Sequence, residues 1–186
     1  MSEEKLTRAA IVTGGSRGIG RAVCVALAKQ GCNVVVNYCH GAEPAEQTAA
    51  FCRAEGVQAV TVQADVSTAE GCKALFDAAA EAFGRVDVLV NNAGIVDYNP
   101  INWVPVETFR RVMDVNVTGM FLCCKAALSG MLQQQKGAII NVSSMWGRVG
   151  SSCEVAYSTS KAAVIGMTKA LAKELGPSGI RVNAVA

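Results

Sequence analysis

The sequence predicts an α/β fold in which a doubly wound parallel sheet of six strands lies between two layers of helices. Short β-prone runs alternate with helical segments along all 186 residues, the pattern of a parallel sheet with right-handed crossovers. The composition is 51% hydrophobic but only 5% aromatic, which favours strands buried on both faces under alanine-rich helices. A glycine-rich turn at residues 13–20 joins the first strand to the first helix. The length fits one domain, residues 1–186.

The elements follow in order along the chain. Strands are expected at residues 8–13, 33–37, 57–64, 86–90, 138–142 and 180–185. Helices are expected from the glycine turn to residue 30, and at residues 46–55, 67–83, 105–114, 115–135 and 154–175. Gly31, Gly56 and Gly84 are expected to end the first three helices, and Ser67 is expected to cap the third. The helical stretch 105–135 is expected to break or bend near residues 116–119.

Composition and charge exclude several classes of protein. The formal net charge of +2 gives no strong attraction to nucleic acid or to a membrane surface, and no run of apolar residues is expected to reach the length of a membrane span. The polar, acidic start of the chain does not resemble a signal peptide. Eight cysteines are scattered without a C-x-x-C pair beside a single histidine, so no metal site is expected. These features predict a cytoplasmic protein whose cysteines are mostly small buried apolar residues.

The glycine-rich turn predicts a phosphate site. Gly14, Gly18 and Gly20 would let the backbone pass close to a pyrophosphate, and the following helix offers free N–H donors and a partial positive charge. The spacing is G-x-x-x-G-x-G rather than G-x-G-x-x-G, and Arg21-Ala22 excludes a P-loop, which requires Lys followed by Ser or Thr there. The alternative is a glycine-rich turn that binds no ligand.

The end of the second strand indicates which dinucleotide is bound. An acidic residue there would bond a ribose 2′-hydroxyl and favour NAD, but the sequence has Asn37, Tyr38 and Cys39. Arg17 in the phosphate loop would instead meet a 2′-phosphate. We therefore predict NADP(H), with a merely solvated Arg17 as the alternative.

A tyrosine and a lysine are placed for acid–base chemistry. Tyr157 and Lys161 lie four residues apart on a predicted helix and so share one face. A free tyrosine has a pKa of about 10, but a cation about 4 Å away contributes roughly 4 kcal/mol at an effective dielectric of about 20. That is enough to bring the phenol into a useful range. Taken alone, the pair also fits an ordinary amphipathic helix.

The motifs together resemble those of the short-chain dehydrogenase/reductase family, which has a Rossmann fold, and the likeness covers the whole chain. T-G-x-x-x-G-x-G is matched at residues 13–20 and N-N-A-G at residues 91–94, and the catalytic tetrad is matched by Asn116, Ser144, Tyr157 and Lys161. Asp65-Val66 matches the pair that contacts adenine. The resemblance implies cofactor contacts at Gly14, Ser16, Arg17, Gly18, Ile19, Gly20, Asn37, Asp65, Val66, Asn92, Ala93, Gly94, Tyr157 and Lys161.

The resemblance also implies a mechanism for reducing a ketone with NADPH. Tyr157 is the general acid, Lys161 lowers its pKa and bonds the nicotinamide ribose, and Ser144 places the carbonyl oxygen. Asn116 would hold a water that links Lys161 to solvent. Ser144 rather than Ser143 is expected to act, because it falls thirteen residues before Tyr157, the spacing usual in the family.

Within the family, the chain resembles two branches. The tail, residues 169–186, fits 3-oxoacyl-acyl-carrier-protein reductases, whereas the segment around Trp146 and Glu154 resembles elongation factor P 5-aminopentanone reductases. As a hypothesis, Glu154 would pair with a substrate ammonium and Trp146 would form an apolar or cation–π wall. The alternative for Glu154 is a first-turn helix residue favoured by the helix dipole. The partner is therefore expected to be a small-molecule or carrier-bound ketone, with elongation factor P as the alternative.

The chain stops at Ala186, on the sixth strand, where family members are expected to continue with a substrate lid and a seventh strand. This departure leaves three expectations: a C-terminal truncation or fragment, an exposed edge at strand six, and a non-catalytic nucleotide-binding module as an alternative to the reductase. By resemblance, the full-length form would be a homodimer or homotetramer that pairs through the helices at residues 115–135 and 154–175.

Overall fold

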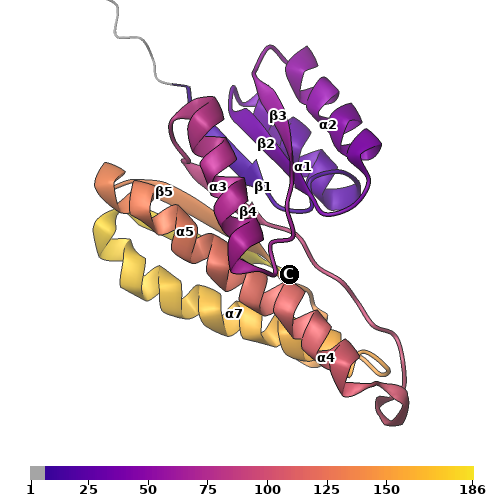
Figure 1. The fold of residues 1–186 in the computed structure, drawn as a ribbon. Coiled ribbons are helices and arrows are strands. Elements are labelled where there is room, and N and C mark those ends of the chain that lie inside the picture. The colour runs from indigo at the N-terminus through magenta and orange to yellow at the C-terminus, as the bar shows by residue number, and fades with distance from the viewer. Residues whose placement is uncertain (1–6) are drawn as a thin grey trace, which may run out of the picture.

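The computed structural model describes residues 7–186 as a parallel sheet between two layers of helices (Figure 1). The six strands are β1 (Ala9–Val12), β2 (Asn33–Tyr38), β3 (Ala59–Gln63), β4 (Val88–Asn91), β5 (Gly137–Val142) and β6 (Ile180–Val185). Their order is β3-β2-β1-β4-β5-β6, and every pair is parallel. The predicted doubly wound α/β class is therefore confirmed, and β3 and β6 are the edge strands of the described sheet.

Seven α-helices connect or follow the strands. They are α1 (Gly18–Lys29), α2 (Ala42–Ala54), α3 (Ala69–Phe83), α4 (Val106–Met113), α5 (Gly119–Gln134), α6 (Trp146–Val149) and α7 (Val155–Leu175). Short 3-10 turns occupy Ile101–Trp103 and Gly176–Ser178. Helices α1 and α2 cover one face of the sheet, and α3, α5 and α7 cover the other (Figure 1).

Alternate residues of each central strand feed two separate cores. In β1, Ile11 faces the cluster under α3, α5 and α7, whereas Ala10 and Val12 face the cluster under α1 and α2. These three side chains have no exposed surface. This two-sided burial explains why the strands are continuous apolar runs rather than alternating ones.

Several boundaries differ from the sequence prediction. Helix α2 begins at Ala42 rather than at residue 46, because Pro44 lies in its first turn, where a missing N–H costs nothing. Thr68, not Ser67, caps α3 by accepting a hydrogen bond from the Gly71 N–H at 3.0 Å. The short helix α6 lies between the predicted strand at residues 138–142 and the predicted helix at residues 154–175, where no helix was expected. The expected stop signals are confirmed, since Gly31, Gly56 and Gly84 all have positive φ.

The predicted irregularity between the two middle helices is a π-helical turn at Asp114–Thr118. It joins α4 and α5 into one helical run, Val106–Gln134, that has the length and mean hydropathy of a membrane span. By length and composition, therefore, the expectation that no run of apolar residues reaches the length of a membrane span was wrong. In the fold, Cys123, Ala127 and Met131 are buried in the cluster against the sheet, as in a core helix.

Candidate active site and nucleotide cavity

A cavity of about 420 Å³ lies at the carboxyl ends of β1 to β4. In doubly wound sheets, ligands bind at this edge, beside the point where the strand order reverses. Most of the predicted cofactor residues line the cavity: Gly14, Ser16, Arg17, Ile19, Gly20, Asn37, Asp65, Val66, Asn92, Ala93 and Gly94. Gly18, Tyr157 and Lys161 are not among its lining residues. Tyr38, Cys39, His40, Ala64, Ile95, Arg111 and Val115 complete the lining and were not predicted as contacts.

The glycines of the first turn allow close backbone contacts that a side chain would prevent. A Cβ at Gly20 would lie 2.2 Å from the Gly14 carbonyl oxygen and 2.7 Å from the Asn92 amide nitrogen. A Cβ at Gly14 would lie 3.0 Å from the Ala93 Cα, and Gly14 has a φ of +60°. The start of α1 is thus pressed against the loops that follow β1 and β4. The resulting backbone cradle fits a pyrophosphate, which needs close main-chain approach and a helix N-terminus.

Thr13 and Asn92 join the two loops that form this cradle. The Thr13 Oγ1 accepts hydrogen bonds from the Asn92 and Ala93 N–H groups, both at 3.0 Å. The Asn92 amide donates back to the Thr13 and Gly14 carbonyls at 2.9 and 3.0 Å. Asn92 therefore links the two loops by hydrogen bonds as well as lining the cavity. Thr13 also belongs to the site, although the sequence analysis included it only as part of the turn motif.

Asn37 also serves the framework of the cavity. Its Oδ1 accepts from the Gly14 N–H at 3.2 Å, and its Nδ2 donates to the Val62 and Ala64 carbonyls at 3.3 and 3.1 Å. The side chain is almost fully buried. Asn37 thus joins the ends of β1, β2 and β3, and the cavity wall beyond it is formed by Tyr38, Cys39 and His40.

The two arginines near the phosphate turn have different surroundings. Arg21 is held by the Ser16 carbonyl, the Thr48 hydroxyl and the Pro44 carbonyl, and it lies over the Phe51 ring. Arg17 is exposed and lines the cavity. The structure therefore offers Arg17, not Arg21, to a bound group, as the sequence predicted.

Asp65 is the acidic residue of this cavity and is held by two neighbours. Its Oδ1 accepts from the Ser67 N–H at 3.0 Å and the Ser67 hydroxyl at 2.6 Å. Its Oδ2 accepts from the Arg111 guanidinium at 3.1 Å. The Ser67 hydroxyl, and then Arg111, hold the pKa of the Asp65 carboxyl below its usual value. Arg111 comes from α4, and no sequence motif pointed to it.

Tyr157 and Lys161 share one face of α7, as predicted. The Lys161 Nζ lies 5.5 Å from the centroid of the Tyr157 ring and donates a hydrogen bond to the Val142 carbonyl at 2.7 Å. Lys161 is 3% exposed, and burial lowers the pKa of its ammonium group to about 8. The side chain is therefore a buried cation near neutral pH beside a half-buried phenol.

The two serines after β5 have different environments. Ser143 is buried, and its hydroxyl donates to the Lys161 carbonyl at 2.9 Å. The Ser144 hydroxyl accepts from the Trp146 N–H at 3.2 Å and is only half-buried, so its proton is available to another acceptor. This difference agrees with the choice of Ser144 over Ser143.

Asn116 lies in the π-helical turn and is fully buried. Its Nδ2 donates to the Ile95 carbonyl and the Ser160 hydroxyl, both at 2.9 Å, and its Oδ1 accepts from the Ile95 N–H at 2.8 Å. Both amide protons are used, so a water linking Lys161 to solvent would have to bond an oxygen atom of Asn116.

Gly94 connects the cavity to the tetrad. A Cβ added there would lie 3.3 Å from the Asn116 Oδ1 and 3.5 Å from the Lys161 Nζ, and Gly94 itself lines the cavity. The predicted cofactor and catalytic residues are thus brought together around one glycine. A ligand that fills the cavity and passes Gly94 would reach the Lys161 ammonium.

The predicted substrate residues lie on either side of the loop before α7. Trp146 begins α6, and Glu154 precedes α7, where its Oε1 accepts from the Ser151 hydroxyl at 3.4 Å. Cys153 between them has a φ of +62°, and its carbonyl accepts from the Asn99 N–H at 2.8 Å. Trp146 and Glu154 belong to none of the cavities found among the described residues.

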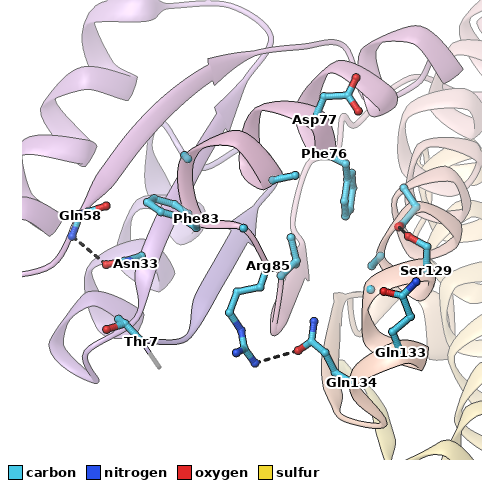
Figure 2. Close-up of a pocket in the computed structure, with 17 residues that line it drawn as sticks. Thr7, Asn33, Gln58, Phe76, Asp77, Phe83, Arg85, Ser129, Gln133 and Gln134 are labelled. Atoms are coloured by element: carbon cyan, nitrogen blue, oxygen red, sulfur yellow. Dashed lines mark hydrogen bonds between the residues drawn. The ribbon is translucent and has the colours of Figure 1, made fainter. Parts of the chain in front are cut away.

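A larger cavity, of about 870 Å³, lies at the opposite ends of the strands, between α3 and α5 (Figure 2). Phe76 and Phe83 come from α3, Gln133 and Gln134 come from α5, and Arg85 donates to the Gln134 amide oxygen at 2.9 Å. None of the predicted site residues line it. Over residues 7–186, no group of three or more histidine, cysteine or acidic side chains is arranged to hold a metal ion.

Comparison with known proteins identifies relatives over nearly the whole chain. The sequence profile of the family described as short chain dehydrogenase matches residues 8–186. The 3-oxoacyl-[acyl-carrier-protein] reductase FabG of Staphylococcus aureus (strain Mu50 / ATCC 700699) is 45% identical over 182 residues, which cover 98% of this chain and 74% of that protein. The 3-oxoacyl-[acyl-carrier-protein] reductase of Synechocystis sp. is 46% identical over 177 residues, covering 95% of this chain and 72% of that protein.

A solved structure agrees with this relationship. The crystal structure of NAD⁺-bound xylitol dehydrogenase superposes with a TM-score of 0.92 at 36% identity, over 98% of this chain and 71% of that one. The match extends over both the glycine turn and the Tyr157–Lys161 helix. The chain therefore belongs to the short-chain dehydrogenase family, has its Rossmann fold, and is an oxidoreductase that acts on CH–OH or C=O groups.

Proposed function

We propose that the protein is an NADPH-dependent ketone reductase. The observation that carries the proposal is the position of Gly94, which lines the nucleotide cavity and at which an added Cβ would lie 3.5 Å from the Lys161 Nζ, beside Tyr157. A cofactor in the cavity would place its reactive end next to a phenol and a buried cation. A binding module would have no need for that arrangement.

The cofactor supplies a hydride when it is bound, and the chain supplies the proton and the positioning. Tyr157 donates its proton to the carbonyl oxygen, because the nearby Lys161 cation stabilises the phenolate that results. Ser144 donates a hydrogen bond to the same oxygen and so orients the carbonyl. Lys161 is held for this task by the Val142 carbonyl, and Asn116 fixes the loop at Ile95 beside it.

The preference for NADP(H) over NAD(H) is part of the proposal. Arg17 is exposed at the cavity, and the residues that line it after β2 are Tyr38, Cys39 and His40, none of them acidic. A carboxylate at that point would repel a 2′-phosphate, whereas Arg17 attracts it. The related xylitol dehydrogenase structure is NAD⁺-bound, so membership of the family does not fix the cofactor and the proposal rests on these residues.

The proposed substrate is a 3-oxoacyl group carried by acyl carrier protein. The support is the printed function of the two relatives at 45% and 46% identity. The elongation factor P alternative gains no support, since neither relative is named for that activity and the cavities described above are lined by neither Trp146 nor Glu154. A cytoplasmic homo-oligomer is proposed on the same family grounds.

The test is oxidation of NADPH with a small β-ketoester and with an amino-ketone, followed by the loss of NADPH absorbance. Tyr157→Phe is expected to lower kcat by about 10²- to 10⁴-fold, because the proton donor is lost, while the Kd for NADPH stays the same. Tyr98→Phe is the matched control, because Tyr98 is 71% exposed. Faster turnover of the ketoester would support the acyl substrate. Turnover that survives in Tyr157→Phe would contradict the mechanism, and NADPH binding without any turnover would support a binding module instead.

A further inference from the structure

Two thiols that the proposed mechanism does not use lie in contact between α3 and α5. The sulfur atoms of Cys72, in the first turn of α3, and Cys123, one turn into α5, are 3.8 Å apart. Both side chains are almost fully buried in the core cluster on that face of the sheet. A disulfide bond is about 2.05 Å long, so its formation requires a further approach of less than about 2 Å. Cys123 also lines a narrow void that includes three residues of the nucleotide cavity, Val66, Ala93 and Val115.

The helix turns that carry the two cysteines are packed against the backbone of one cavity wall. A Cβ at Gly71 in α3 would lie 2.1 Å from the Asp65 carbonyl oxygen. A Cβ at Gly119 in α5 would lie 2.9 Å from the Val66 carbonyl oxygen. Asp65 and Val66 both line the nucleotide cavity. Because these contacts are between backbone segments, a movement of α3 and α5 toward each other displaces this wall instead of rotating a side chain.

We propose that Cys72 and Cys123 form a redox modification site, in which a peroxide converts the two thiols into a disulfide bond that displaces the cavity wall and weakens cofactor binding. The effect on the cofactor rests on the proposed function, whereas formation of the disulfide does not. The site would thus make the affinity for NADPH depend on the redox state of the protein.

Hydrogen peroxide is small enough for an enclosed pair and accepts both electrons of the reaction. The Cys72 thiolate attacks one peroxide oxygen, the O–O bond breaks, and the departing hydroxide takes up a proton to become water, which leaves a sulfenic acid at Cys72. The Cys123 sulfur then attacks the Cys72 sulfur, the S–O bond breaks, and a second water leaves with the Cys123 proton. Two sulfur atoms are oxidised and two peroxide oxygen atoms are reduced.

The two thiols are suited to different steps. The hydrogen bond from Cys123 lowers the pKa of the Cys72 thiol, so Cys72 is the thiol that ionises and attacks the peroxide. The same hydrogen bond, and then burial, raise the pKa of the Cys123 thiol. Cys123 therefore stays protonated until the sulfenic acid has formed, and it acts in the second step.

The experiment measures disulfide formation and NADPH binding in the same samples. Cys39 and Cys153 are the partly exposed cysteines of the chain, so both are replaced by alanine and every comparison is made within that background. The protein is treated with hydrogen peroxide, its remaining thiols are alkylated, and a cross-link between the Cys72 and Cys123 peptides is expected in the mass spectrum. The Kd for NADPH, from a fluorescence titration, is expected to rise about fivefold or more and to return to its starting value after reduction with dithiothreitol.

The controls identify which thiols form the bond. Cys124→Ala is the matched control, because Cys124 is the buried neighbour of Cys123 and its sulfur accepts a hydrogen bond from the Asn91 amide at 3.3 Å. That variant should still form the cross-link and show the same rise in Kd. Cys123→Ala should form no cross-link and should keep its Kd after peroxide treatment. If Cys123→Ala does not fold, Cys72→Ala removes the pair from the α3 side with the same expected result.

The outcomes separate this inference from the proposed function. Free thiols at both Cys72 and Cys123 after peroxide treatment would overturn the modification site, whatever the protein binds. A cross-link that leaves the Kd for NADPH unchanged would show that the disulfide does not control cofactor binding, while the cofactor proposal would stand. A reduced protein that does not bind NADPH would overturn the proposed cofactor and its control, whereas the cross-link would still establish the modification site.

Discussion

The most unusual residue of the site is the buried Lys161. Its ammonium has one hydrogen bond to a described residue, from Nζ to the Val142 carbonyl, and no carboxylate lies within ion-pair distance of it among residues 7–186. Burial without a counter-ion disfavours the charged form, which is why its pKa falls to about 8. The chain thus retains a costly cation at the position where the proposed chemistry needs one.

This cost predicts a pH-dependent stability. Because the pKa of Lys161 is lowered in the folded state, the free energy of unfolding of the wild-type protein increases as pH rises from about 8 to 10.5. Since one pKa unit corresponds to about 1.36 kcal/mol, the gain is about 3 kcal/mol. Urea unfolding of wild type and Lys161→Met at pH 7 and pH 10 checks this. The free energy of unfolding of Lys161→Met relative to wild type should be lower at pH 10 than at pH 7. For Lys169→Met, which replaces an exposed lysine on α7, this difference should not change with pH. Parallel curves for wild type and Lys161→Met would contradict the assignment.

At the scale of elements, the start of α3 sets the position of the Asp65–Val66 corner. Gly71 lies in the first turn of α3, and a Cβ there would come within 2.1 Å of the Asp65 carbonyl oxygen. The contact is with backbone, so it cannot be relieved by a rotamer change. Helix α3 is therefore docked directly against Asp65 and Val66, which line the cavity.

Gly71→Ala is expected to move this corner and to weaken both folding and cofactor binding. The expected loss is about 1–3 kcal/mol in the free energy of unfolding, typical of overpacking, together with a higher Kd for NADPH. Gly166→Ala is the matched control, since a Cβ at Gly166 meets nothing within 4 Å. That change should stabilise α7 by about 0.5–1 kcal/mol. Equal stabilisation by both substitutions, measured by urea unfolding, would show that the corner is free to move.

How far the sequence predicted the site also differs between elements. The strands and the glycine turns follow from local patterns, so the α/β class and the break near Asn116 were found from sequence, whereas the tetrad was predicted from the family resemblance. Arg111 could not be found, because its partners lie 44 and 46 residues away and no motif records the contact. The cap of α3 was misassigned because Ser67 and Thr68 are adjacent and both suitable, and Asp65 engages the first of them.

The sheet has two halves that meet where β1 pairs with β4. Different hydrogen bonds hold this junction at the carboxyl ends and at the amino ends of the two strands. At the carboxyl end, Thr13 and Asn92 form the cradle of the cavity. At the amino end, the Asp87 Oδ2 accepts from the Ala9 N–H at 2.9 Å and from the Arg85 Nε at 2.8 Å. Arg85 also donates a hydrogen bond to Gln134 of α5 (Figure 2), so this charged network lies at the amino ends of the strands, opposite the proposed cofactor site.

This separation predicts that the amino-end junction can be weakened without affecting the cofactor. Asp87→Asn is expected to lower the free energy of unfolding by about 2–3 kcal/mol, because it leaves the partly buried Arg85 guanidinium without its charge partner. The Kd for NADPH should change by less than about twofold, since distant sites act independently.

Asp77→Asn is the control: it removes a carboxylate from an exposed pair with Lys73 and should lower the free energy of unfolding by less than about 1 kcal/mol. Urea unfolding and NADPH titration of both variants measure the two effects. A marked loss of NADPH affinity in Asp87→Asn would show that the amino and carboxyl ends of β1 and β4 are coupled, because a change at the amino ends would then alter the cavity at the carboxyl ends.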